Sequence, residues 1–275
     1  MLLLQMKLIR KIDDLNKALQ KDQKIGFVPT MGGLHKGHES LIMVSKKKCK
    51  KTLVSIFVNP TQFNNKNDYI SYPRNINKDL KILKRLNVDF VFLPSETSIL
   101  RKKSEKFQLK KSQKILCAKF RKGHFEGVLD IMNRFTKLIL PKNIFMGEKD
   151  YQQFFLVKKM IQKKFITKVF SCKTIRSNDS IALSSRNHLL NKNNLKVVSS
   201  ITKKLIKLKR SISINKRNKK ILIKKIKNDI LHNYDVKIDY LEVRNTLDLK
   251  TDILNKKYRI FIAYHINGIR LIDNL

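Results

Sequence analysis

Short apolar runs alternate with amphipathic stripes over the first part of the chain. The runs predict buried strands at residues 25–28, 53–58, 88–93, 144–146 and 165–175. Two stripes between these runs have helical spacing: Ile76, Leu80 and Leu83 in one, and Val128, Met132, Phe135 and Ile139 in the other. Because such alternation is typical of parallel strands joined by crossover helices, we expect an α/β fold with a Rossmann-like, parallel-sheet nucleotide-binding domain.

The pattern changes near Ile175. Lys-rich helical segments follow, and then two strand-like stretches at residues 236–243 and 258–266. We therefore expect two domains. Residues 1–175 form the Rossmann-like domain, and residues 176–275 form a smaller C-terminal α+β domain.

The chain is strongly basic. Its 275 residues include 61 Lys and Arg against 21 Asp and Glu, for a net charge of +40, and 42% are hydrophobic, which suits a globular protein. Such a charge is also typical of nucleic-acid-binding proteins. Here the basic residues are spread over nearly every helical face without interleaved aromatic residues, so we favour solvated surfaces and expect no nucleic-acid partner.

The cysteines and the start of the chain bear on the compartment. Cys49, Cys117 and Cys172 are widely spaced and form no C-x-x-C pair, as expected for free thiols in a reducing compartment. The first apolar run is too short for a signal peptide or a membrane span. We expect a cytoplasmic protein with no membrane association.

The segment PTMGGLHKGH, residues 29–38, lies between a predicted strand and a predicted helix. Its glycines allow close approach of a ligand, and unsatisfied N–H groups at the helix start attract phosphate. His35 and His38 are three residues apart and can donate to phosphate oxygens from one side of the helix. No further His or Cys cluster completes a metal site. A glycine-rich turn without a ligand remains the alternative.

Two further segments carry candidate binding groups. In VNPTQF, residues 58–63, the amide of Gln62 can donate to and accept from a small hydroxy acid, although the segment can also be an ordinary turn. In FRKGHFEGV, residues 120–128, Arg121 can pair with a carboxylate or a phosphate. His124 is ambiguous, because a lone histidine at a helix start more often has a packing role.

Two more segments suit a nucleotide. In GEKDYQQ, residues 147–153, Lys149 is a candidate phosphate ligand, Asp150 can hold a ribose hydroxyl or hydrated Mg²⁺, and Gln153 can bind a carboxylate or hydroxyl. Acidic residues also suit a plain helix start. In IALSSRN, residues 181–187, two hydroxyls and Arg186 suit a triphosphate.

These segments together resemble those of one family. The H-x-G-H run after P-T-M-G is similar to the HIGH-type signature of class I nucleotidyltransferases. The five segments and RLIDN, residues 270–274, resemble the pantothenate synthetase (pantoate:beta-alanine ligase) family over essentially the whole chain. The chain departs from that pattern at Lys122 in place of Pro, Ser180 in place of Gly and Asn245 in place of Asp, and it has fewer acids around Asp68.

The resemblance implies a two-step ligase reaction. Pantoate attacks the α-phosphorus of MgATP to give pantoyl adenylate and pyrophosphate, and beta-alanine then displaces AMP to form pantothenate. It implies His38 as the main catalytic residue, assisted by His35, Lys149 and Arg186. The second domain would close over the site.

The resemblance also implies ligand contacts and an assembly. ATP contacts are expected from Met31, Gly32, Gly33, Leu34, His35, Lys36, Gly37 and His38, from Gly147, Glu148, Lys149 and Asp150, and from Ile175, Leu183, Ser184, Ser185 and Arg186. Pantoate contacts are expected from Asn59, Gln62, Arg121 and Gln153. Mg²⁺ would arrive with ATP, near Asp150, without a protein cage. A homodimer without a prosthetic group is expected.

Two alternatives remain open. Another nucleotidylyltransferase of the same superfamily would share the histidine segment but not the pantoate segments. A basic nucleic-acid-binding protein would account for the charge but would not need His35, His38 or Lys149.

Overall fold

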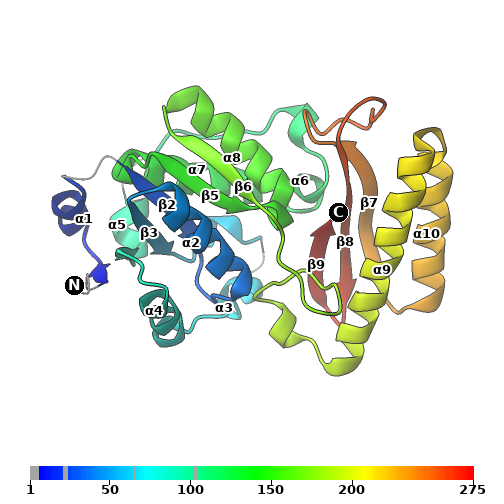
Figure 1. Ribbon diagram of the computed structural model, residues 1–275, viewed down its shortest axis with the longest axis horizontal. Helices are drawn as coiled ribbons and strands as arrows, with labels where there is room; N and C mark the ends of the chain where they lie inside the picture. The colour runs from blue at the N-terminus through cyan, green and yellow to red at the C-terminus, as the bar shows by residue number, and fades with distance from the viewer. Residues whose placement is uncertain (1–5, 21–23, 65, 102–103) are drawn as a thin grey trace. The chain divides into compact units, whose positions relative to one another are not determined.

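A computed structural model describes residues 6–20, 24–64, 66–101 and 104–275 (Figure 1). The chain divides into two compact units, the first ending at Thr174 and the second comprising Ile175–Leu275. The division lies one residue before the expected boundary.

The first unit is built on a six-stranded sheet. Its strands are β1 (Lys7–Ile9), β2 (Ile25–Thr30), β3 (Lys51–Ile56), β4 (Phe90–Phe92), β5 (Asn143–Gly147) and β6 (Lys168–Cys172). All pair in parallel, in the order β1-β4-β3-β2-β5-β6. The predicted parallel α/β fold is confirmed. The strand predicted at 165–175 was too long, and β1 was missed.

Helices cover both faces of this sheet. They are α1 (Ile12–Leu19), α2 (Lys36–Lys48), α3 (Lys66–Ile70), α4 (Ile76–Arg85), α5 (Glu96–Leu100), α6 (Cys117–Phe120), α7 (His124–Ile139) and α8 (Tyr151–Lys164). On one face Ile42 of α2 and Leu83 of α4 pack with Val28 and Val54. On the other, Phe135 of α7 makes edge contacts with Phe27, Phe57 and Phe92. Burial of both faces explains why these strands read as continuous apolar runs.

The strand order brings three sequence segments to one edge of the sheet. Strand β2 lies between β3 and β5, and the chain continues from β2 through β3 and β4 on one side and returns to β5 on the other. The order therefore reverses next to β2, and ligands of doubly wound sheets bind at such a switch point, beyond the carboxyl ends of the strands. The segments that leave β2, β3 and β5 here are residues 31–38, 57–62 and 148–150.

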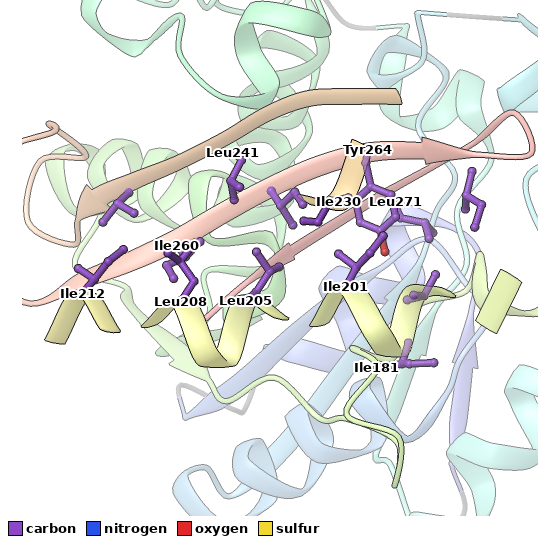
Figure 2. Close-up of a cluster of buried hydrophobic side chains, with 14 of the residues drawn as sticks. Ile181, Ile201, Leu205, Leu208, Ile212, Ile230, Leu241, Ile260, Tyr264 and Leu271 are labelled. Atoms are coloured by element: carbon purple, nitrogen blue, oxygen red, sulfur yellow. The ribbon is translucent and has the colours of Figure 1, made fainter. Parts of the chain in front are cut away.

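The second unit packs two helices on a small antiparallel sheet. Its elements are α9 (Lys192–Ile214), α10 (Lys219–Asn233), β7 (Lys237–Asn245), β8 (Tyr258–Ile266) and β9 (Ile269–Asn274). Figure 2 shows the apolar stripe of α9, which includes Ile201, Leu205 and Leu208, lying against the sheet residues Leu241 and Ile260. The smaller α+β architecture is confirmed, with three antiparallel strands where the sequence suggested two.

Candidate active site

The loop after β2 is held by hydrogen bonds to its own backbone N–H groups. Gly32 and Gly33 adopt positive φ angles of 81° and 62°, a conformation that favours glycine. The N–H of Gly32 donates to Thr30 Oγ1 over 3.2 Å. The N–H groups of Gly33 and Leu34 donate to the two carboxylate oxygens of Asp79 over 2.9 and 2.8 Å. Asp79 lies on α4 and is only 1% exposed.

His35 and His38 form the start of α2. His35 is the N-cap, and its Nδ1 accepts the N–H of Gly37 over 3.1 Å. His38 Nδ1 in turn accepts the N–H of His35 over 3.4 Å, and the ring centroids are 4.2 Å apart. Because each Nδ1 acts as an acceptor, each neutral ring carries its proton on Nε2. The two Nε2–H groups are therefore the hydrogen-bond donors that the pair can offer to a ligand.

These bonds bear on the expectation that orphan N–H groups at the start of the helix attract phosphate. Five N–H groups already have acceptors within the protein, those of Gly32, Gly33, Leu34, His35 and Gly37. At the helix start, the N–H groups of His35 and Gly37 are therefore not orphan donors, because the two imidazoles accept from them. Among the described residues, the backbone N–H of Lys36 has no acceptor, whereas the backbone N–H of His38 is directed to the His35 side chain in a capping box. Apart from the N–H of Lys36, the donors that this loop can offer to an anion are therefore on side chains.

Both histidines are neutral at pH 7. Burial is the largest cause that lowers their pKa values, to about 4 for His35 and about 3 for His38. The cation of Lys149 adds to the shift at His35, and the neighbouring His35 adds to it at His38, whereas Asp150 opposes the shift at both. The donors are thus imidazole N–H groups and not imidazolium ions.

Lys149 and Asp150 follow β5 in a single 3-10 turn, η3 (Glu148–Asp150), and Asp150 precedes α8. The Lys149 Nζ lies 3.8 Å from Asp150 Oδ2, and both charges act on the two histidines. Glu148 accepts a hydrogen bond from Ser171 Oγ over 3.0 Å. No atom of the described part of the chain comes within 4 Å of a Cβ built on Gly147, so the strand end is open there.

The segment after β3 uses Asn59 within the protein. Asn59 is 1% exposed; its Nδ2 donates to Gly127 O over 3.1 Å, and its Oδ1 accepts from the Thr61 hydroxyl over 3.0 Å. A Cβ on Gly127 would lie 2.5 Å from Thr61 O, so α7 contacts this turn directly. Asn59 therefore supports the turn that carries Gln62.

Arg121 and His124 also contact this turn. His124 Nδ1 donates to Gln62 O over 2.7 Å, and Arg121 Nη2 donates to the same oxygen over 3.3 Å. With its proton on Nδ1, His124 accepts at Nε2 from Arg121 Nη1 over 3.0 Å. His124 is buried at the start of α7, which fits the packing role. Two groups thus fix the backbone of Gln62.

The side-chain amides of Gln62 and Gln153 are candidate ligand-binding groups. Gln62 is buried and Gln153 is half-buried, and neither side-chain amide has a hydrogen-bond partner among the described residues. The neighbouring Gln152 instead donates to Gln113 O and to Ile115 O, at 3.3 and 2.7 Å. Side-chain amides without internal partners are suited to a polar ligand.

The remaining candidates belong to the second unit. Ser184 Oγ accepts the N–H of Arg186 over 3.2 Å, and the N–H of Leu183 donates to Ile175 O over 3.0 Å. Arg176 fixes this loop: it donates to Ser180 O over 2.9 Å and pairs with both oxygens of Asp273 at 2.8 Å.

Two departures from the family pattern gain an explanation in the second unit. Ser180 has a positive φ of 67°, the conformation that the family's glycine would adopt more readily. Asn245 is fully buried, donates to two carbonyl groups and accepts the N–H groups of Leu247 and Asp248. An aspartate could accept these bonds but could not donate, so Asn245 suits its site.

Sequence reasoning missed Asp79. Its position in the first turn of α4 is typical of an acid that complements the helix dipole, and no local signal shows that its partners lie 45 and 46 residues away. The described residues contain neither a group of three metal-ligating side chains nor a helix long and apolar enough to cross a membrane.

The Pantoate-beta-alanine ligase family model matches residues 6–275. A pantothenate synthetase of Leptospira biflexa serovar Patoc is 38% identical over 275 residues, covering 97% of both chains. The crystal structure of pantothenate synthetase from Thermus thermophilus superposes with a TM-score of 0.89 at 29% identity, covering 98% of this chain and 99% of that one. The crystal structure of pantoate-beta-alanine ligase from Francisella tularensis, complexed with beta-gamma ATP and beta-alanine, superposes with a TM-score of 0.82 at 37% identity. The match covers 98% of this chain and 97% of that one.

Proposed function

The chain belongs to the pantoate-beta-alanine ligase family, and from this premise we propose that it condenses pantoate with beta-alanine to pantothenate in two ATP-dependent steps. In the first step a pantoate carboxylate oxygen forms a bond to the α-phosphorus of ATP, and pyrophosphate leaves. In the second step the beta-alanine amine attacks the acyl carbon of pantoyl adenylate, loses a proton, and AMP leaves. No protein nucleophile takes part.

One observation carries the catalytic assignment. Two neutral imidazoles present Nε2–H donors beside Lys149 at the carboxyl end of the central strand. Fixed donors aimed at the transferring group stabilise the charge that develops there, and they need no reorganisation during the reaction. We assign this role to His38 and His35. Lys149 neutralises phosphate charge, and Arg186 contributes from the second unit.

Pantoate is assigned to the two unpartnered amides. Gln62 and Gln153 bind its carboxylate, which accepts hydrogen bonds, and its hydroxyl groups, which donate and accept them. Arg121 and Asn59, expected as ligands, act through the turn that carries Gln62, because their observed bonds go to the protein. Arg121 can still reach a carboxylate with the rest of its guanidinium.

ATP is assigned to residues 31–38 and 147–150 and, from the second unit, to Ile175 and residues 183–186. The Asp150 carboxylate beside Lys149 suits a Mg²⁺ ion that keeps most of its ligands from phosphate and water. Mg²⁺ bound to the triphosphate would neutralise charge on the leaving pyrophosphate. We also propose a cytoplasmic homodimer without a nucleic-acid partner.

The reaction is tested by incubating the purified protein with ATP, Mg²⁺, pantoate and beta-alanine. Pantothenate and AMP should form in equal amounts, and exchange of pyrophosphate into ATP should require pantoate. Exchange without pantoate would favour another nucleotidylyltransferase. Absence of both products would overturn the proposal.

A further inference from the structure

We propose that Asp79 is a positioning residue of the proposed active site, which holds the loop after β2 so that His35 and His38 present their Nε2–H groups. This inference rests on the proposed function only for its kinetic consequences. The geometry itself concerns the loop, the buried carboxylate and the start of α2.

Asp79 joins two crossover elements of the sheet. Its carboxylate, on α4, accepts from consecutive N–H groups of the loop that enters α2, and each oxygen takes one bond. None of the described lysines or arginines forms an ion pair with it. A buried carboxylate whose charge is met only by backbone N–H groups and a helix start depends on that geometry, and the loop in turn depends on it.

The clamp acts directly on the histidine pair. Gly33 and Leu34 immediately precede His35, whose N–H and Nδ1 make the two bonds that define both rings. If Asp79 released the two N–H groups, the glycines could adopt other φ angles and the N-cap geometry would be lost. Asp79 also bars a phosphate oxygen from these two N–H groups, which directs the nucleotide to the imidazoles and Lys149.

Asp79→Asn tests the clamp with little change of volume. One of the two acceptors becomes an NH₂ group facing an N–H, so one bond is lost. Misplacement of the histidines should lower kcat/KM for ATP by roughly tenfold to a hundredfold, with the KM for pantoate nearly unchanged. In the ligand-free protein, the nitrogen-15 signals of His35 and His38 should lose the pattern of a protonated Nε2 and an accepting Nδ1.

Asp89→Asn is the matched control. Asp89 Oδ2 accepts the N–H of Thr52 over 2.8 Å at the opposite end of β3, so its loss removes the same kind of bond away from the site. It should lower stability but change neither kcat/KM for ATP nor the imidazole signals. If Asp79→Asn matched this control in kcat/KM, or left the imidazole signals unchanged, the inference would be overturned.

A measurement on the unmodified protein covers the case in which Asp79→Asn does not fold. The amides of Gly33 and Leu34 should exchange with deuterium much more slowly than the amide of Lys36, which lacks an acceptor among the described residues. Equal exchange rates would overturn the clamp. Because this arm and the nitrogen-15 arm need no turnover, they remain decisive even if the protein forms no pantothenate.

Discussion

The loop after β2 and the pair Gln62 and Gln153 lie in the same unit but satisfy their polar groups differently. In the loop, internal acceptors take five N–H groups, and two Nε2–H groups remain for a ligand. At Gln62, two side chains bind the backbone oxygen and the whole side-chain amide remains. The loop fixes the direction of its donors, as the proposed transition-state stabilisation requires, whereas the amides keep both donors and acceptors for the proposed binding of pantoate.

The largest effect should come from the loop. His38→Ala removes a preorganised donor and should reduce adenylate formation by about a hundredfold or more, measured as pantoate-dependent pyrophosphate exchange. His232→Ala, an exposed histidine in the last turn of α10, is the control and should leave the rate unchanged. If His38→Ala formed the adenylate at nearly the rate of the unmodified protein, His38 would not be the donor that stabilises the transferring group.

The amide pair should show an intermediate effect. Gln62→Ala or Gln153→Ala should raise the KM for pantoate by roughly three- to tenfold, the scale of one or two net hydrogen bonds, and leave the KM for ATP unchanged. Gln152→Ala is the matched control, because its amide binds backbone carbonyls and should affect stability alone. If ATP binding weakened instead, Gln62 and Gln153 would belong to the nucleotide site.

Protonation distinguishes the loop from the amides, which do not titrate. The pKa values of His35 and His38 fall from 6.5 to about 4 and about 3 on folding, so the unfolded chain binds more protons between these values. The contribution of these two histidines to stability is therefore greatest above pH 6.5 and decreases as the pH falls toward 3. In the double variant His35→Gln, His38→Gln, the Tm should fall less than in the unmodified protein when the pH is lowered from about 6.5 to about 4.5. An equal fall in Tm for the two proteins would contradict the depressed pKa values.

The smallest effect should come from surface charge. Lys220 and Lys225 are exposed on α10, whereas Lys219 donates to Thr251 O and has a local role. The double variant Lys220→Gln, Lys225→Gln should leave kcat unchanged at physiological salt, because exposed charges beyond about 10 Å are screened at roughly 0.1 M salt. Lys149→Ala should lower kcat at every salt concentration. A salt series on both variants decides whether the distant charge has a direct role.

The sequence predicted the parts of this molecule that depend on local pattern. The apolar runs located β2, β3, β4 and β5, and the stripe from Val128 to Ile139 located α7. Strand β1 was missed because Lys7–Ile9 is too short for a periodic signal. The clamp by Asp79 could not be predicted, since it depends on how two crossovers pack, and neither could the tautomers of the histidines, which depend on hydrogen bonds about 3 Å long.

The surroundings of Gly37 limit which residue position 37 can accept. A Cβ there would lie 2.7 Å from His35 Cε1 and 2.9 Å from Nδ1, so the residue leaves room for the capping ring. The chain is rich in Lys, whose codons are rich in A, and contains only 8 Gly, whose codons are rich in G; three of the eight lie at positions 32, 33 and 37. A codon bias can replace residues on the exposed helices by lysine without disturbing the fold. At position 37 even alanine would displace the His35 ring, so we expect glycine to be retained there against the same bias.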